Sequence, residues 1–427
     1  MTSTIENSGS LAPLRNKDFR LLFVGYAIGQ MLMPLQFFTQ IFWVQQNAPK
    51  SIWLLLVSLI GASRGFGALT FGLYGGALAD RFDRKKLLIV SQVLLLLTTL
   101  AISAIIFSNQ GSALGFILFF VLSFFASGLL SIDAPTRLAI VPDILGPKLT
   151  PAGMSLNQAA GQLSMPVAIF GVGLIIDAFG FGGAYLLSSV GHLIMIISVA
   201  LMSYRSTFTN RDTQRGTYGI RQAIVDVRFG LSYARGHKVI LWVIILVALM
   251  TGIGFPATAN LGPTWITTVV GVKIKHVGFV AVTWGIGAFL AAVVSARFSS
   301  FERRGALIAF GAMLFSLAFV IFVAGHSVTN VVIGNFGLGA GMTTAMVSST
   351  ILIQHVVPNE VRGRIMSIFQ LNMGFAQLMT LPVAALGQWL TLQLLFPIMS
   401  LTLLAIIILI LVTQPQIIKA RISETSL

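Results

Sequence analysis

Between two long apolar runs the chain carries the charged segment Gly76-Ala77-Leu78-Ala79-Asp80-Arg81-Phe82-Asp83-Arg84-Lys85-Lys86. Six of these eleven residues are charged, whereas only 9% of the whole chain is. The apolar runs on either side, about 52–79 and 87–107, each reach the roughly 20 residues that a helix needs to cross a bilayer. The segment therefore indicates a short charged loop between two membrane-spanning helices.

The rest of the chain follows the same plan of apolar runs and short polar loops. Its 427 residues are 56% hydrophobic, with a mean hydropathy of +0.91. A soluble protein carries charge on about a quarter of its residues, and a disordered chain is poor in apolar residues, so both classes are excluded. Runs of spanning length cover 19–45, 52–79, 87–107, 112–133, 151–177, 183–204, 239–266, 277–296, 305–324, 328–353, 364–389 and 391–413. The sequence predicts an all-α membrane protein with twelve transmembrane helices.

The distribution of Lys and Arg gives the orientation. Of the 27 basic residues, 23 fall in segments that share one side of the membrane. The other side has Lys50, Lys273 and Lys275, and Arg64 falls within a span. Because basic residues accumulate in cytoplasmic loops, we expect both termini in the cytoplasm, in a plasma (inner) membrane, with the first span retained. Basic clusters between apolar runs also argue against a nucleic-acid partner, which would require one basic face.

The longest polar interval, 205–238, divides the chain into an N-terminal half (1–204) and a C-terminal half (239–427) of six spans each. Within it, Ile220, Ile224, Val227 and Leu231 recur at helical spacing. This pattern is typical of an amphipathic helix on the inner membrane surface, and a solvated linker helix is the alternative.

The two halves also repeat one another. Short stretches of the first half match stretches of the second half in the same order, 215 or 216 residues further along the chain. An alignment of the two halves therefore needs gaps of a single residue. The matches pair Arg81-Phe82 with Arg297-Phe298, Val141-Pro142 with Val357-Pro358, and Leu156-Asn157 with Leu371-Asn372. Two six-helix bundles related by duplication are an architecture of secondary transporters.

The segment 76–86 resembles the signature loop of the major facilitator superfamily, Gly-x-Leu-Ala-Asp-Arg-x-Gly-Arg-Arg/Lys, which joins spans two and three. Asp83 replaces the second glycine. The segments 14–20 and 134–142 look like those of the enterobactin-exporter and macrolide-efflux branch of that superfamily. The resemblance implies two pseudo-symmetric six-helix bundles that enclose a central site and work by alternating access.

The resemblance also implies that the loop is a gating latch. In the family, the aspartate at the position of Asp80 contacts span eleven, and a basic residue, here Arg84, contacts an acid on span four, for which Asp133 is the candidate. The alternative is that the basic residues only set topology, and that Asp133 and Arg137, four residues apart, are a simple helix pair. The predicted latch comprises Gly76, Asp80, Arg81, Arg84, Asp133 and Arg137.

Arg64 is the one formal charge deep within a predicted span. It lies roughly 18 Å and 24 Å along a helix from the two ends of its span. A cation at that depth is costly unless it is paired or hydrated, and glycines on its helix face direct it into the protein. We expect an anion-binding site in the central cavity, with a structural hydrogen bond to a neighbouring helix as the alternative.

Neutral polar residues complete the predicted substrate cavity. Amides beside aromatic residues suit an amphipathic solute, although amides in membranes also simply bond across helices. Besides Arg64, the predicted cavity comprises Gln36, Gln40, Asn157, Gln158, Gln162, Asn260, Trp284, Asn372 and Gln377. His192, in the middle of span six, could carry a coupled proton, but span six is peripheral in the resembled fold. We therefore expect His192 to be a satisfied structural histidine.

These features favour a secondary transporter that exports a small amphipathic or anionic organic solute, such as a siderophore or drug-like molecule, against inward proton movement. We expect no metal and no cofactor; the chain has no cysteine and no GxxxxGK[ST] loop that would bind ATP. Met165 stands where exporters of the family often have glycine, so import of an anionic metabolite is the alternative. A polytopic membrane enzyme is less favoured, because the acids and histidines are scattered.

Overall fold

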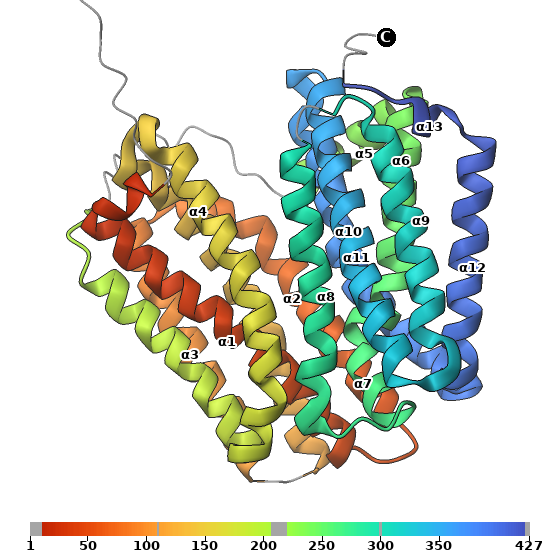
Figure 1. Cartoon of the computed structure of the whole chain (residues 1–427). Coiled ribbons are helices and arrows are strands. Elements are labelled where there is room, and N and C mark those ends of the chain that lie inside the picture. Colours follow the sequence, from red (N-terminus) through yellow and green to blue (C-terminus); the bar gives the residue numbers. More distant parts are fainter. Residues whose placement is uncertain (1–10, 109–110, 206–219, 299–300, 423–427) are drawn as a thin grey trace, which may run out of the picture. The chain divides into compact units, whose positions relative to one another are not determined.

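The computed structural model describes residues 11–108, 111–205, 220–298 and 301–422, and Figure 1 shows that these segments are helical. They form two compact units. Unit 1 contains Met1–Thr39, Gly67–Ala168 and Phe179–Tyr218. Unit 2 contains Gln40–Phe66, Ile169–Ala178 and Gly219–Leu427.

In the described residues of the N-terminal half, continuous backbone hydrogen bonding defines four α-helices. They are α1 (Lys17–Asn47), α2 (Trp53–Arg81), α3 (Arg84–Phe107) and α4 (Ala113–Ala200). The last of these is three helical legs in succession. Gly146 (φ 67°, ψ 173°) and Gly180 (φ 65°, ψ 177°) leave the helical conformation, and only glycine adopts this region without strain. The first leg therefore covers 113–145, the second 147–179 and the third 181–200. Pro147 opens the second leg, where a missing backbone N–H costs little.

After the N-terminal half the chain continues with α5 in the predicted linker and then with α6, and its last helix is the short α13. Between α6 and α7 the chain continues through two π-helical turns, Met250–Gly254 and Pro256–Asn260, where Pro256 interrupts regular α-helical bonding. The bounds are α5 Ile220–Gly236, α6 Lys238–Leu249, α7 Gly262–Thr268, α8 Ile274–Arg297, α9 Arg304–Val323, α10 Val328–Val356, α11 Asn359–Leu390, α12 Leu392–Thr413 and α13 Gln416–Lys419.

The predicted spans all have helical counterparts. Among the described residues, nine helices are long and apolar enough to cross a membrane. One of the nine is α4, whose three legs match three predicted spans, and another, Gly374–Thr413, runs across α11 and α12. The expectation of an all-α membrane protein is confirmed. The first leg of α4 continues twelve residues past the predicted end of its span, to 145, because Asp133 and Arg137 are buried against neighbouring helices.

Asp83, the departure from the family signature, begins a helix. Its side chain accepts a hydrogen bond from the backbone N–H of Lys86 at 3.0 Å and so caps the N-terminus of α3. Aspartate is a favoured residue at this position. The substitution for glycine therefore has a local structural role.

Unit 2 combines C-terminal helices with short pieces of the N-terminal half. Gln45 of α1 donates to Thr267 Oγ1 at 3.1 Å, and the rings of Phe170 and Phe279 meet edge to face with centroids 4.7 Å apart. These units follow packing contacts and differ from the boundaries at 204 and 238. The division into two six-helix domains joined by a 205–238 linker stays a prediction.

The predicted linker helix is present as α5, and its C-terminal end packs on protein. Ala234 is fully buried in a cluster with Ile353, Ile365 and Phe369. In the preceding turns of α5, Phe229 and Leu231 are exposed. The side chains of 220–227 lie outside the described residues, so the membrane-surface role of α5 stays a prediction.

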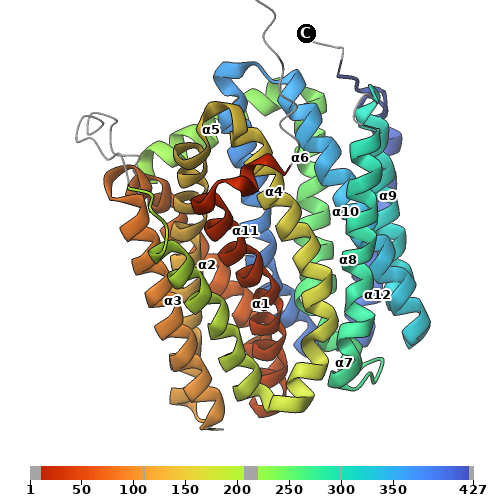
Figure 2. The same ribbon diagram turned by 60° about the vertical axis from the view of Figure 1, so that its left-hand side comes forward.

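Close helix packing in unit 2 depends on glycines. Figure 2 shows α8, α9 and α10 side by side, and α10 contacts both of the others. A Cβ on Gly339 of α10 would overlap the carbonyl oxygen of Trp284, and one on Gly287 of α8 would overlap that of Phe336. Small residues at such crossings allow the backbones to approach, as is common in membrane bundles.

We expect Gly339→Ala to destabilise the protein by about 1–3 kcal/mol, because the new methyl group meets backbone that cannot move without separating α8 from α10. Gly29→Ala is the matched control, since a Cβ there meets nothing within 4 Å. Alanine is the better helix former, so this control should be neutral or stabilising. Thermal unfolding of the two purified variants in detergent measures the difference, and equal unfolding temperatures would contradict the packing argument.

Candidate functional site

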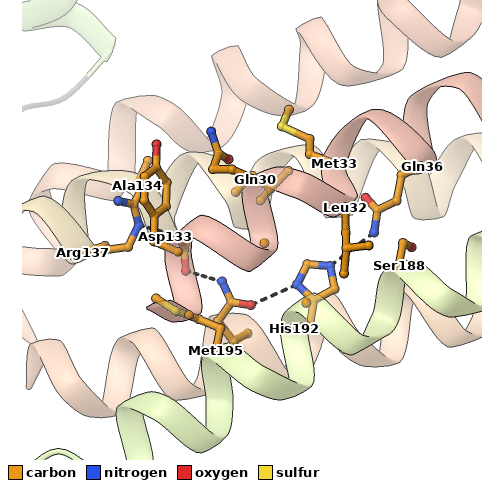
Figure 3. Close-up of a pocket in the computed structure, with 16 residues that line it drawn as sticks. Gln30, Leu32, Met33, Gln36, Asp133, Ala134, Arg137, Ser188, His192 and Met195 are labelled. Carbon is orange, nitrogen blue, oxygen red and sulfur yellow. Dashed lines mark hydrogen bonds and ion pairs between the residues drawn. The ribbon is translucent and has the colours of Figure 1, made fainter. Parts of the chain in front are cut away.

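A cavity of about 330 Å³ lies within unit 1. It is lined by α1, by Gln92 of α3, and by the first and third legs of α4. Figure 3 shows polar side chains from these elements directed toward one another across it. Gln30, Met33 and Gln36 come from α1, Asp133 and Arg137 from the first leg, and Ser188 and His192 from the third.

A chain of hydrogen bonds runs along one wall of this cavity. Gln92 Nε2 donates to Asp133 Oδ1 at 2.7 Å, and Gln92 Oε1 lies 2.9 Å from His192 Nδ1. On the other side of the ring, His192 Nε2 lies 3.3 Å from Gln36 Nε2, which is also 3.4 Å from Thr99 Oγ1. Three separate helices, α1, α3 and α4, thus contribute to one continuous network.

Arg137 neutralises Asp133 and also packs on an aromatic ring. Its Nε lies 3.7 Å from Asp133 Oδ2, and its guanidinium carbon lies 3.8 Å from the centroid of Tyr26. Only 8% of Arg137 and 6% of Asp133 are exposed. A buried ion pair needs such further partners, because desolvation offsets much of its attraction.

The acid that faces Arg84 is Asp143, and the expectation that it would be Asp133 is wrong. Arg84 Nη1 lies 2.8 Å from Asp143 Oδ2 and 3.1 Å from the carbonyl of Ala139. Tyr204 donates to the same carboxylate oxygen. The physical reason is distance along the helix: Asp143 lies roughly 15 Å beyond Asp133, at the level where α3 begins. The side chains of Gly76, Asp80 and Arg81 lie outside the described residues, so the latch stays a prediction.

A second polar cluster lies in unit 2. Asn260 Nδ2 donates to Gln377 Oε1 at 3.1 Å and to Thr380 Oγ1 at 2.6 Å. A Cβ on Gly61 of α2 would lie 3.2 Å from Gln377 Oε1, so α2 packs closely on this cluster. Arg64, one turn further along α2, is half-buried and has an interaction partner. The space that Gly61 leaves on the face of α2 is therefore occupied by Gln377 and Thr380 of α11.

The other predicted cavity residues do not line the unit 1 cavity, and their substrate role stays a prediction. Gln40, Asn157 and Asn372 are buried, Trp284 is half-buried and Gln158 is exposed. Within the described part of the chain, neither polar atom of the Asn157 amide has a hydrogen-bond partner, nor does the amide nitrogen of Asn372. The side chain of Gln162 lies outside the described residues.

Sequence reasoning missed Gln92, and it considered His192 without placing it at a cavity. His192 is hydrogen-bonded on both ring nitrogens, as expected of a structural histidine, yet it also lines the cavity. The sequence signal that could have found them is that Gln92 and His192 are each a polar residue within a long apolar run. It could not show that spans three and six meet at Gln92 and His192.

The sequence and the fold both match one transporter family. The sequence model of the Major Facilitator Superfamily matches residues 21–381 of this chain. The Staphyloferrin A transporter of Staphylococcus aureus (strain NCTC 8325 / PS 47) is 22% identical over 359 residues, which are 84% of this chain and 85% of that protein.

Several solved structures share the fold at low sequence identity. A POT family transporter in complex with 5-aminolevulinic acid has a TM-score of 0.70 and 14% identity, over 93% of this chain and 96% of the other. The nucleoside transporter NupG has a TM-score of 0.70 and 12% identity, over 92% and 98%. A bacterial homolog to the human lysosomal transporter Spinster has a TM-score of 0.68 and 12% identity, over 95% and 96%. With the family match extending over most of its length, this chain belongs to the Major Facilitator Superfamily and is a multi-pass membrane transporter of a small solute, not an enzyme.

Proposed function

We propose that this transporter exports a small anionic or amphipathic organic solute by alternating access, driven by the inward movement of protons. The observation that carries the proposal is the cavity in unit 1, where a carboxylate, a guanidinium, an imidazole and amides stand beside Met33 and Tyr26. A mixed lining of this kind suits a solute with both polar and apolar parts.

The class of solute is supported by the relative named for staphyloferrin A, a siderophore. Asp133 is neutralised by Arg137, so the unit 1 cavity offers a solute no net charge. We therefore assign the preference for anions to Arg64 of α2, whose helix neighbours Gly61 and Gly65 pack against Gln377 of α11. The proposed setting is the inner membrane, with both termini in the cytoplasm, as the distribution of basic residues indicates.

Purified protein in liposomes tests the proposal with labelled staphyloferrin A as the probe. A proton antiporter accumulates the probe when the lumen is acidic, because protons leaving the vesicle drive the solute inward. A symporter accumulates it when the outside is acidic. We expect accumulation with an acidic lumen, abolished when a protonophore collapses the gradient and absent from protein-free liposomes.

The two other outcomes are informative. Accumulation only with an acidic exterior would replace export by import of an anionic metabolite. No flux of staphyloferrin A under either gradient would reject this siderophore class as the solute.

A further inference from the structure

The hydrogen-bond chain along the unit 1 cavity has a definite direction. Gln92 donates to Asp133 through its amide nitrogen, which leaves its carbonyl oxygen facing His192 Nδ1. A carbonyl oxygen only accepts, so Nδ1 carries the ring proton. Gln36 presents its amide nitrogen, which only donates, so His192 Nε2 is the acceptor of that bond. His192 is therefore neutral, with an unprotonated Nε2 beside Gln36.

We infer that His192 binds the coupling proton on Nε2 and that Gln36 transmits this event to the cavity. This inference rests on the proton coupling contained in the proposed function. A histidine within membrane-spanning segments is a common element of proton relays in transporters. His192 and Gln36 both line the cavity.

The alternative proton carrier in the cavity, Asp133, is poorly suited to this task. Its carboxylate is held by Arg137 at 3.7 Å and by Gln92 at 2.7 Å. Protonation of Asp133 would leave the buried guanidinium of Arg137 without its counter-charge, which is strongly unfavourable. Among the described residues, the contact that His192 Nε2 would lose is the 3.3 Å one with Gln36.

The charges that face His192 come from one helix leg. The cavity-lining residues of α1 contribute Tyr26 as a titratable group, and Gln92, the cavity-lining residue of α3, is neutral. The first leg of α4 contributes Asp133 and Arg137, and the carboxylate is the nearer partner, since Gln92 connects it to the ring. Burial of the ring opposes its positive charge, and the bond from Nδ1 to the carbonyl of Gln92 is kept when the ring is protonated.

Protonation changes one hydrogen bond of the chain. A hydronium ion from the acidic side gives its proton to the lone pair of Nε2, so that one N–H bond forms, one O–H bond of the hydronium breaks and a water molecule remains. The new N–H then points at the amide nitrogen of Gln36, and two donors cannot bond to each other. Gln36 must turn its carbonyl oxygen toward the ring or leave it, and either movement alters the cavity wall and the bond to Thr99.

The transport test compares gradient-driven accumulation with exchange. His192→Gln keeps a polar side chain that can donate and accept but cannot bind a proton. In proteoliposomes with staphyloferrin A, we expect this variant to lose accumulation driven by a pH gradient and to keep exchange of labelled for unlabelled probe. The control is His355→Gln, an exposed histidine whose Nδ1 contacts the carbonyl of Ile351, which should keep both activities.

The second test needs neither a substrate nor a functional variant. Nitrogen NMR of wild-type protein labelled at histidine, assigned with single variants of the other histidines, reports which ring nitrogen carries a proton. We expect His192 to be protonated on Nδ1 at alkaline pH and to gain a proton on Nε2 on acidification. The side-chain amide signal of Gln36 should shift with it.

The outcomes separate this inference from the proposed function. Equal loss of accumulation and exchange in His192→Gln, or loss of neither, would make His192 a structural hydrogen-bonder. A ring protonated on Nε2 at alkaline pH, or one that stays neutral on acidification, would also overturn the inference. Absence of any staphyloferrin A flux in wild-type protein would instead reject the proposed solute, and the NMR result would still decide the role of His192.

Discussion

Asp133→Leu should destabilise the protein by about 3–5 kcal/mol, because removal of one member of a buried ion pair leaves the other uncompensated. Arg137 is 8% exposed and, among the described residues, would keep its contact with the ring of Tyr26 but lose its counter-charge. Gln92 would in addition lose the acceptor for its 2.7 Å hydrogen bond. Thermal unfolding in detergent should show a large decrease in unfolding temperature.

A matched acid on the same helix provides the control. Asp143 pairs with Arg84 at 2.8 Å, but the two side chains are 24% and 27% exposed. Because water screens this pair, Asp143→Leu should cost at most about 1 kcal/mol. The double variant Asp133→Leu/Arg137→Leu should recover part of the stability that Asp133→Leu loses, since no buried charge is left unpaired. Equal destabilisation by Asp133→Leu and Asp143→Leu would show that burial of the first pair has no energetic consequence.

Arg64→Gln is expected to abolish transport of an anionic solute while the protein still reaches the membrane. The guanidinium lies on α2 one turn from Gly61, which contacts Gln377 of the unit 2 polar cluster. Loss of the charge removes the electrostatic partner of the anion, whereas glutamine keeps a shorter side chain that can still donate and accept hydrogen bonds. Arg64→Lys should retain only part of the activity, because a point charge lacks the planar fork of donors.

The decisive measurement compares staphyloferrin A with its neutral amide derivative in the same vesicles. Only the charged solute should lose transport in Arg64→Gln. Arg362→Gln is the control, because Arg362 lies in the first turn of α11 and donates to the carbonyl of Val357 at 3.0 Å. Should Arg64→Gln slow both solutes equally, or neither, Arg64 has a structural hydrogen-bonding role and the anion site is elsewhere.

The sequence was sufficient for the spans because each of them is a local property. A helix in lipid satisfies its own backbone hydrogen bonds, so apolar length alone identifies it without knowledge of its neighbours. The predicted runs therefore reappear as helices, even where three of them follow one another within α4 and are separated at Gly146 and Gly180. The ends were less accurate: Asp133 and Arg137 lower the hydropathy but lie buried within the first leg.

The partners of individual side chains required the tertiary structure. The family resemblance implied that Arg84 pairs with an acid on the fourth span, yet Asp143 and not Asp133 lies level with the start of α3. Likewise, Gln92 and His192 are single polar residues in apolar runs, and nothing in either run indicates that they meet.

The sequence by itself determined the class of protein, the number of spans and the family signature, because hydrophobicity, length and short motifs are contained within continuous stretches of chain. Only the tertiary structure decided which polar groups share the unit 1 cavity, since Gln36, Gln92, Asp133 and His192 come from segments up to 156 residues apart. Which of these helices touch, and at what level, is set by side-chain packing across their whole length. That packing is a collective property, and no single stretch of sequence encodes it.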